Sequence, residues 1–113
     1  MNSLTPEDAK LATLARATRA RTGAAEGAAI RDADGRTYAA ASVALPSLTL
    51  SALQVCVAMA VASGSQGLEA AVVLTEADEV SAPDLAVLTE FGGTGVVVHR
   101  GDPRGAIAAT SST

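Results

Sequence analysis

The sequence predicts an α/β fold in one domain, with a mixed sheet of four to five strands between helices in three layers, α/β/α. Three observations predict this class. A hairpin pattern surrounds the turn residues 32–35 and follows a helical N-terminal segment. A strand–helix–strand pattern over residues 70–98 indicates a parallel pair with a right-handed crossover. Between them, the nearly uncharged stretch 48–64 reads as a helix that should be covered on more than one side.

The first expected element is a helix that begins after Thr5 and ends at Gly23. Thr5 can cap its N-terminus, Pro6 suits the first turn, and the carboxylate of Asp8 is placed to answer the cap. The apolar residues that recur at helical spacing, and are expected to face the core, are Leu11, Leu14 and Ala15.

The hairpin and the apolar helix come next. Residues 27–31 and 36–41 are expected to form two strands, with a glycine in the turn between them. Pro46 and Ser47 interrupt the pattern before the apolar helix, and Gly64 supplies its stop.

The second half supplies the strand–helix–strand unit. Residues 70–74 form a short apolar run, which is typical of a strand buried on both faces. A helix should begin near Ser81 and close at Gly92, and residues 95–99 should form another buried strand. Residues 106–109 add a weak edge strand. The ends of the single domain, which spans 1–113, are expected to be flexible: residues 1–4 and 110–113.

Composition excludes several classes of protein. The net charge of −4 provides no basic field for phosphates, so nucleic acid is not expected as a partner. The apolar run from Leu50 to Ala62 is shorter than the about 20 residues that span a bilayer, and no signal peptide precedes it, so no membrane is expected. One cysteine cannot form an internal disulfide, which favours a reducing cytoplasm. Abundant alanine, and arginine in place of lysine, favour a GC-rich bacterial source, namely an actinobacterium.

Several phrases, in this order, resemble the cytidine deaminase family. They lie between about Ala9 and Val98 and are Gly27-Ala28-Ala29, Asp34-Gly35-Arg36-Thr37-Tyr38, Ala60-Val61-Ala62-Ser63-Gly64 and Leu88-Thr89-Glu90-Phe91-Gly92. The resemblance implies a mixed five-stranded sheet flanked by helices, often assembled as dimers or tetramers.

The family's chemistry needs zinc, which is held by a Cys/His-Ala-Glu phrase and a Pro-Cys-x-x-Cys phrase, with the glutamate shuttling protons. In register, the first phrase falls on Ser51-Ala52-Leu53, so a serine takes the ligand position and a leucine the proton-shuttle position. The second phrase falls near residues 80–85, where Ser81 lies and no cysteine occurs. The resemblance therefore implies a chain without zinc, cofactor or catalytic residues.

Two further family phrases are also replaced. The family grips its nucleoside with a Phe before the Gly-Ala-Ala phrase and with an Asn-Val-Glu phrase after the second strand. Here these positions read Ala24 and Ser42-Val43-Ala44. Ring stacking and ribose recognition are therefore expected to be lost together with catalysis.

Two residues outside these phrases attract attention as reactive groups. Cys56 lies between apolar neighbours and is expected to be a small buried hydrophobe rather than a nucleophile. His99 is expected to be a solvated histidine at a strand end, since Arg100 and a turn follow it. A thiolate–imidazole pair between them is not expected.

An acidic segment lies between a buried strand and a helix, where open α/β sheets usually place ligands. Its carboxylates could hold a hard cation, or they could form a solvated loop with Asp84 favouring a helix N-terminus. These residues are Glu76, Asp78, Glu79 and Asp84.

Three functions remain open at this point. The first is a catalytically inactive, structural or interaction protein that forms a homo-oligomer, a dimer or tetramer, and binds a protein partner that the sequence does not identify. The second is a module that binds a nucleoside or base near Ser42, Ser51 and Ser81 without catalysis. The third is a hydrolase or deaminase with non-standard chemistry.

Overall fold

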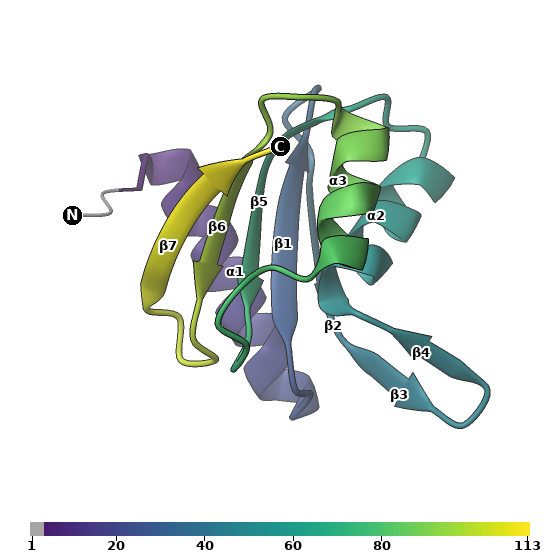
Figure 1. Cartoon of the computed structure of the whole chain (residues 1–113), viewed down its shortest axis with the longest axis vertical. Helices are drawn as coiled ribbons and strands as arrows, with labels where there is room; N and C mark the ends of the chain where they lie inside the picture. The colour runs from purple at the N-terminus through teal and green to yellow at the C-terminus, as the bar shows by residue number, and fades with distance from the viewer. Residues whose placement is uncertain (1–3) are drawn as a thin grey trace.

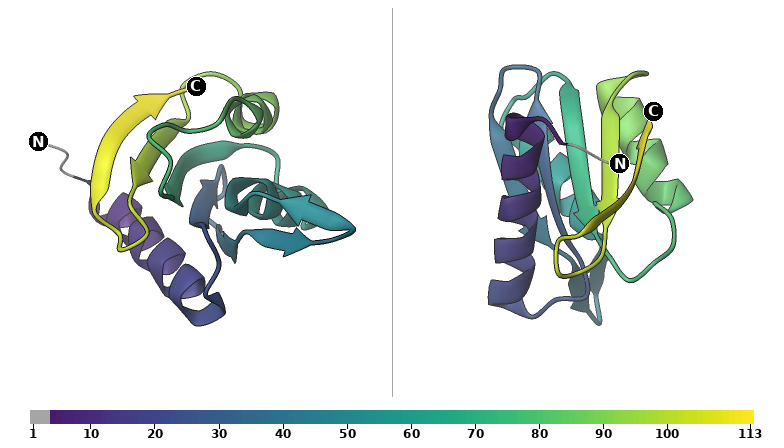
Figure 2. Two further views of the ribbon diagram at one scale, coloured as in Figure 1. Left: turned by 60° about the horizontal axis from the view of Figure 1, so that its bottom comes forward. Right: turned by 90° about the vertical axis from the view of Figure 1, so that its left-hand side faces the viewer.

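A mixed five-stranded sheet forms the centre of the protein in the computed structural model, which describes residues 4–113. The strand order is β2-β1-β5-β6-β7, and only the β5–β6 pair is parallel. Helix α1 covers one face of the sheet, and α2 and α3 cover the other (Figure 1, Figure 2). The predicted three-layer class is therefore confirmed. The strands of this sheet are β1 (Gly27–Asp32), β2 (Thr37–Ala41), β5 (Leu68–Leu74), β6 (Val97–Gly101) and β7 (Ile107–Ser112).

Helix α1 (Pro6–Thr22) has the predicted ends. The Thr5 hydroxyl accepts a hydrogen bond from the Asp8 backbone N–H at 3.1 Å, and Gly23 ends the helix in a left-handed conformation. Leu11 and Ala15 are completely buried, but Leu14 is 37% exposed, so the expectation for Leu14 was wrong. Within residues 4–113, α1 is the only helix on its face of the sheet, so a narrow apolar stripe is enough to pack it against the strands while its outer face stays exposed.

Strand β5 supplies both halves of the core. Alternate side chains of its apolar run point to opposite faces of the sheet. Ala71 and Val73 pack with α2 and α3, whereas Val72 and Leu74 pack with α1. The prediction of a strand buried on both faces is confirmed, because six of its seven residues are buried.

The stretch 48–64 is not one helix. Helix α2 (Ala52–Ala62) is shorter, and Leu48–Leu50 is strand β4, which pairs with β3 (Val43–Leu45). Pro46 and Ser47 lie between these two strands. The resulting hairpin projects from the body of the molecule (Figure 1). Apolar residues alternate with smaller ones on each strand, at Val43 and Leu45 and again at Leu48 and Leu50, and the nearly uncharged helical sequence follows directly.

The C-terminal region also differs from expectation. Helix α3 (Ala82–Gly92) has the predicted ends, but the last two strands lie further along the chain than residues 95–99 and 106–109. Residues 110–112 belong to β7, and the Thr113 N–H donates to the Val96 carbonyl at 3.0 Å. The expectation for residues 1–3 falls outside the described residues. No helix within residues 4–113 is long and apolar enough to cross a membrane.

His99 is buried rather than solvated, which corrects the sequence-based expectation. Its Nε2 lies 2.8 Å from Asp8 Oδ2, and its Nδ1 lies 2.8 Å from Thr110 Oγ1. Arg31 lies 3.0 Å from the other Asp8 oxygen. The Asp8 carboxylate therefore joins α1 to β1 and β6 instead of answering the helix cap.

Gly27 lets α1 lie directly against the start of β1. A Cβ atom at this position would lie 2.4 Å from the Ala15 carbonyl oxygen and 2.6 Å from the Cβ of Arg19. Both contacts are far inside van der Waals distance, so any side chain here would force the helix and strand apart.

We expect Gly27→Ala to lower the free energy of unfolding by about 1–3 kcal/mol, because the added methyl group overpacks the helix–strand contact. Urea denaturation measures this. Ala25→Ser, at an exposed position two residues earlier, should stay within about 0.5 kcal/mol of the wild type. Equal stability of Gly27→Ala and the wild type would contradict the close approach.

Asp32 is completely buried in the β1–β2 turn. Its carboxylate accepts hydrogen bonds from Ser65 Oγ at 2.5 Å and from the backbone N–H groups of Asp34 and Arg36, each at 2.9 Å. Burial alone would raise the pKa of Asp32, but these hydrogen bonds hold it below its ordinary value of 3.8. The pKa of Asp8 is likewise lowered: burial opposes the shift, and His99 and Arg31 produce it.

Stability should therefore fall as pH drops through 3.8 towards these lowered values, because the unfolded chain binds protons that the native carboxylates resist. Above pH 3.8 the stabilisation is complete. Urea midpoints measured from neutral to acid pH should show this slope. Asp32→Asn keeps an acceptor for the turn and should flatten the slope, whereas Ala33→Ser in the same turn should not. An unchanged slope in Asp32→Asn would contradict this account.

Candidate functional site

The N-termini of α2 and α3 meet at one point, and Ser51 lies there. Its Oγ accepts the Gln54 N–H at 3.1 Å, and its own N–H donates to Gln54 Oε1 at 2.9 Å, which makes a complete capping box for α2. The same hydroxyl donates to Asp84 Oδ1 at 2.5 Å. One side chain thus caps one helix and binds the first turn of the other.

Ser81 and Asp84 begin α3. The Ser81 hydroxyl caps the helix by accepting the Asp84 N–H at 3.3 Å, and the Asp84 side chain is buried. The two residues are three positions apart, as are the two cysteines of a Pro-Cys-x-x-Cys phrase. Ser51 and Ser81, the two positions where the resemblance implies zinc ligands, therefore both hydrogen-bond to Asp84.

These three side chains do not fit zinc. Structural and catalytic zinc sites use thiolate, imidazole and carboxylate ligands, whereas Ser51 and Ser81 offer neutral hydroxyls. The only carboxylate, that of Asp84, accepts a hydrogen bond from the Ser51 hydroxyl. The donors are thus engaged with one another and with the helix caps.

Leu53 and Cys56 lie behind this point, in the core between α2 and the sheet. Both are completely buried. The Cys56 thiol lies 3.6 Å from the Tyr38 carbonyl oxygen, and burial raises its pKa to about 12. Since His99 packs against α1 on the other side of the sheet, Cys56 and His99 cannot act as a pair.

A hollow of about 390 Å³ opens beside Ser51. Ser42 and Ala44, at the family's nucleoside-gripping positions, line it, whereas Ala24 precedes lining residue Ala25. Ser81 is not among the lining residues. The full lining is Ala25, Glu26, Ser42, Val43, Ala44, Thr49, Leu50, Ser51, Thr75 and Glu76.

Glu26 is a residue of this hollow that the sequence did not single out. Its Oε2 accepts a hydrogen bond from the buried Thr75 hydroxyl at 3.0 Å, and its Oε1 lies 3.4 Å from the Ala52 N–H at the start of α2. The Glu26 N–H also donates to Ser42 Oγ at 3.1 Å. A charged residue directly before a buried strand was the only available signal, and it is a weak one.

The four acidic residues of the 76–84 segment do not form one site. Asp84 is buried against Ser51, while Glu76, Asp78 and Glu79 are exposed. Glu76 borders the hollow beside Ser51, and Asp78 and Glu79 border a different depression near Arg100. Within residues 4–113, no three histidine, cysteine, aspartate or glutamate residues are grouped so that they could hold a metal ion.

Solved structures of cytidine deaminases resemble this chain. The enzyme from Burkholderia pseudomallei superimposes with a TM-score of 0.80 at 21% identity, covering 96% of this chain and 93% of that one. The enzyme from Mycobacterium leprae gives 0.74 at 21% identity, covering 96% and 94%. The enzyme from Mycobacterium tuberculosis gives 0.68 at 25% identity, covering 79% and 80%.

No curated protein sequence matches the chain. A family model described as cytidine deaminase-like matches residues 4–105, which is most of the sequence. This match includes β1, both helix N-termini at the Ser51–Asp84 contact, and strand β6. The chain therefore belongs to the cytidine deaminase-like family.

Proposed function

We propose that this protein is a catalytically inactive, degenerate member of its family, with a structural or protein-interaction role as a homo-oligomer. One observation supports the proposal of inactivity: Ser51 and Ser81 have hydroxyl groups at the ligand positions that the resemblance implies, and these hydroxyls bind Asp84, one at its carboxylate and the other at its backbone N–H. A zinc ion activates water by lowering its pKa, so without the ion the family's hydroxide is not formed.

The proton-transfer group is missing as well. A general acid–base residue must exchange a proton with the reacting group. Leu53 has no exchangeable proton and is buried in the core. Restoring a metal alone would therefore not restore deamination, and we assign no catalytic residue and no cofactor.

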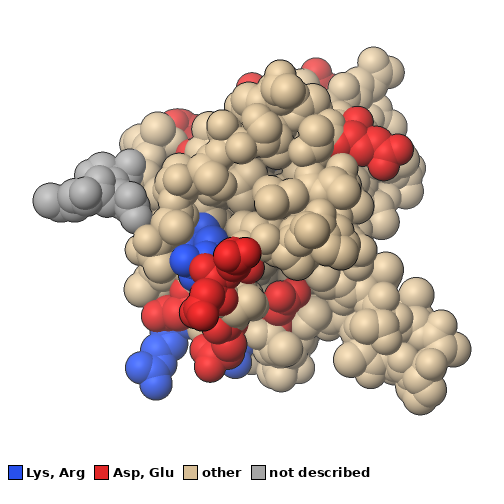
Figure 3. All heavy atoms as spheres, in the orientation of Figure 1, with Lys and Arg blue, Asp and Glu red and all other residues tan. Residues whose placement is uncertain are grey.

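A projecting hairpin and a helix without charged residues support the homo-oligomer. No charged residue occurs between Arg36 and Glu69. Leu45 and Leu48 of the β3–β4 hairpin are 56% and 48% exposed, and Val61 of α2 is 54% exposed. Figure 3 shows the projecting hairpin without acidic or basic side chains, while acidic groups gather elsewhere. Exposed apolar patches of this kind mark interaction sites.

A second copy is a suitable partner for this surface. A two-fold axis brings a patch against its own equivalent, so a charged patch would repel itself, whereas an uncharged one carries no such cost. The single thiol of Cys56 is consistent with a reducing bacterial cytoplasm, and the arginine- and alanine-rich composition favours an actinobacterial source. The identity of any further protein partner is not proposed.

The hollow beside Ser51 favours a second candidate function, which is non-catalytic binding of a nucleoside or base. Its wall has both apolar residues, such as Val43, and hydroxyl groups, such as those of Ser42 and Thr75. Mixed walls of this type bind small polar molecules. A rise in melting temperature with cytidine or cytosine would favour this function.

The zinc argument predicts that purified wild-type protein incubated with zinc binds no stoichiometric metal and does not convert cytidine to uridine. The triple variant Ser51→Cys, Ser81→Cys, Asp84→Cys places thiolates at the three positions and should bind about one zinc per chain. Elemental analysis after dialysis measures the zinc bound to the wild type and to the triple variant.

The matched control moves the same three cysteines to exposed positions: Ser47→Cys, Ser63→Cys, Asp78→Cys. This control should retain no stoichiometric zinc. Stoichiometric zinc in the wild type, together with cytidine turnover that a chelator abolishes, would overturn the proposal of inactivity.

The oligomer is tested at the hairpin. Light scattering should give a mass of at least two chains for the wild type and one chain for Leu45→Asp, Leu48→Asp, because the charges would be buried against their own copies. Leu14→Asp introduces one such charge on α1, across the sheet from α2, and should leave the mass unchanged. A monomeric wild type at high concentration would contradict the oligomer.

A further inference from the structure

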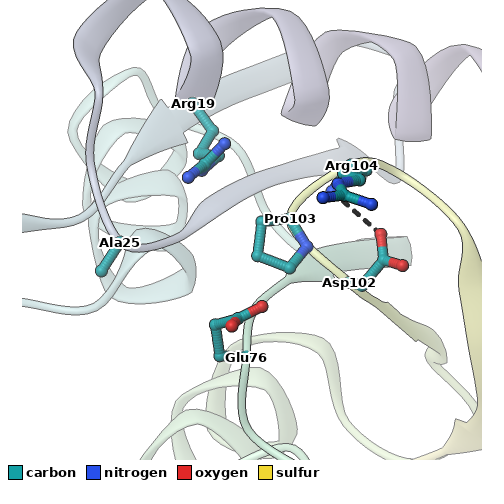
Figure 4. Close-up of a pocket in the computed structure, with 6 residues that line it drawn as sticks. All are labelled: Arg19, Ala25, Glu76, Asp102, Pro103 and Arg104. Carbon is teal, nitrogen blue, oxygen red and sulfur yellow. Dashed lines mark hydrogen bonds between the residues drawn. The ribbon is translucent and has the colours of Figure 1, made fainter.

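A depression of about 480 Å³ lies where four segments meet, namely the last turn of α1, the α1–β1 loop, the β5–α3 loop and the β6–β7 turn. Figure 4 shows it with its lining residues. These are Arg19, Ala25, Glu76, Asp102, Pro103 and Arg104. None of them belongs to the phrases that resemble the deaminases.

Two guanidinium groups border this depression without carboxylate partners. All ion pairs within residues 4–113 involve Arg31 or His99, so neither Arg19 nor Arg104 takes part in one. Arg19 donates its Nε–H to the Ala24 carbonyl at 3.1 Å, which orients the group and leaves its terminal nitrogens for a ligand.

The lining also contains two carboxylates, those of Glu76 and Asp102. Asp102 Oδ1 accepts hydrogen bonds from the backbone N–H groups of Arg104 at 2.9 Å (Figure 4) and of Ala106 at 3.2 Å, which stabilise the β6–β7 turn. Glu76 lies on the opposite side of the depression from the two guanidinium groups (Figure 4). Arg19 and Arg104 therefore lie on one side of the depression, with Asp102 beside Arg104, and Glu76 offers a carboxylate acceptor on the other side.

The depression adjoins the hollow beside Ser51, because Ala25 and Glu76 line both. The two hollows are therefore neighbours on the surface. Guanidinium groups pair with phosphate through two parallel hydrogen bonds, and a phosphomonoester carries close to two negative charges at neutral pH, which matches two arginines. A carboxylate opposite them suits hydroxyl donors.

We propose that Arg19 and Arg104 bind the phosphate of a small phosphomonoester whose neighbouring hydroxyl groups donate hydrogen bonds to Glu76. The ligand class is a sugar phosphate or a nucleoside monophosphate. This site goes beyond the proposed function, since it requires neither the loss of zinc nor an oligomer.

Isothermal titration at about 50 mM salt, where charge screening is modest, tests the site with ribose 5-phosphate against ribose and inorganic phosphate. Ribose 5-phosphate should bind most tightly. Arg19→Gln and Arg104→Gln should each weaken binding roughly tenfold, the loss of one charge-assisted hydrogen bond. Arg21→Gln, an exposed charge on the last turn of α1, should leave affinity unchanged.

Three results would overturn the proposal: no binding of ribose 5-phosphate at about 10 mM, an equal loss of affinity in Arg21→Gln, or ribose binding as tightly as its phosphate. Inorganic phosphate binding as tightly as ribose 5-phosphate would overturn the role of Glu76. Tighter binding of cytidine 5′-monophosphate than of ribose 5-phosphate would support the site and identify a nucleotide as the ligand. Melting curves of each variant establish that it is folded.

Discussion

The architecture of this protein depends on the convergence of two helix N-termini at one point, where the Ser51 hydroxyl donates to the Asp84 carboxylate. The topology forces this meeting, since α2 leads into β5 and α3 joins β5 to its parallel neighbour β6. Both helices therefore begin at the same end of the sheet. Two N-termini place several unsatisfied N–H groups and two positive dipole ends close together, which favours a negative charge between them. Asp84 supplies that charge.

If the proposed loss of catalysis holds, this arrangement explains how the fold persists without the family's zinc ligands. Thiolates bound to zinc and a carboxylate bound to a hydroxyl both place anionic or acceptor groups at the helix ends. The replacement by serine and aspartate therefore keeps the caps of α2 and α3, and it permits a leucine at position 53 to extend the core. Stability and catalysis make separate demands on these residues, and only the first needs to be met for the chain to fold.

Local patterns were enough to predict most of the fold. The Thr5 cap, the β1–β2 turn and the apolar run of β5 each contain their whole signal within a few residues. The β3–β4 hairpin was missed because residues 43–50 are apolar in a way that suits either a strand or the start of α2. Contacts between distant segments were also beyond reach. His99 is buried by Asp8, which lies 91 residues away, and Ser51 binds Asp84, which lies 33 residues away. The site positions were predicted through family register rather than through residue chemistry, so Glu26 was overlooked.

The complete burial of Cys56 makes its thiol a probe of local opening of the native structure. It is the only thiol in the chain, and it lies between α2 and the sheet, where a reagent cannot touch it. A thiol reagent can label Cys56 only after α2 separates from the sheet. The labelling rate in the absence of denaturant therefore reports how often this local opening occurs. Cys56, at the centre of the apolar helix, therefore reports on the local stability of the layer that contains it.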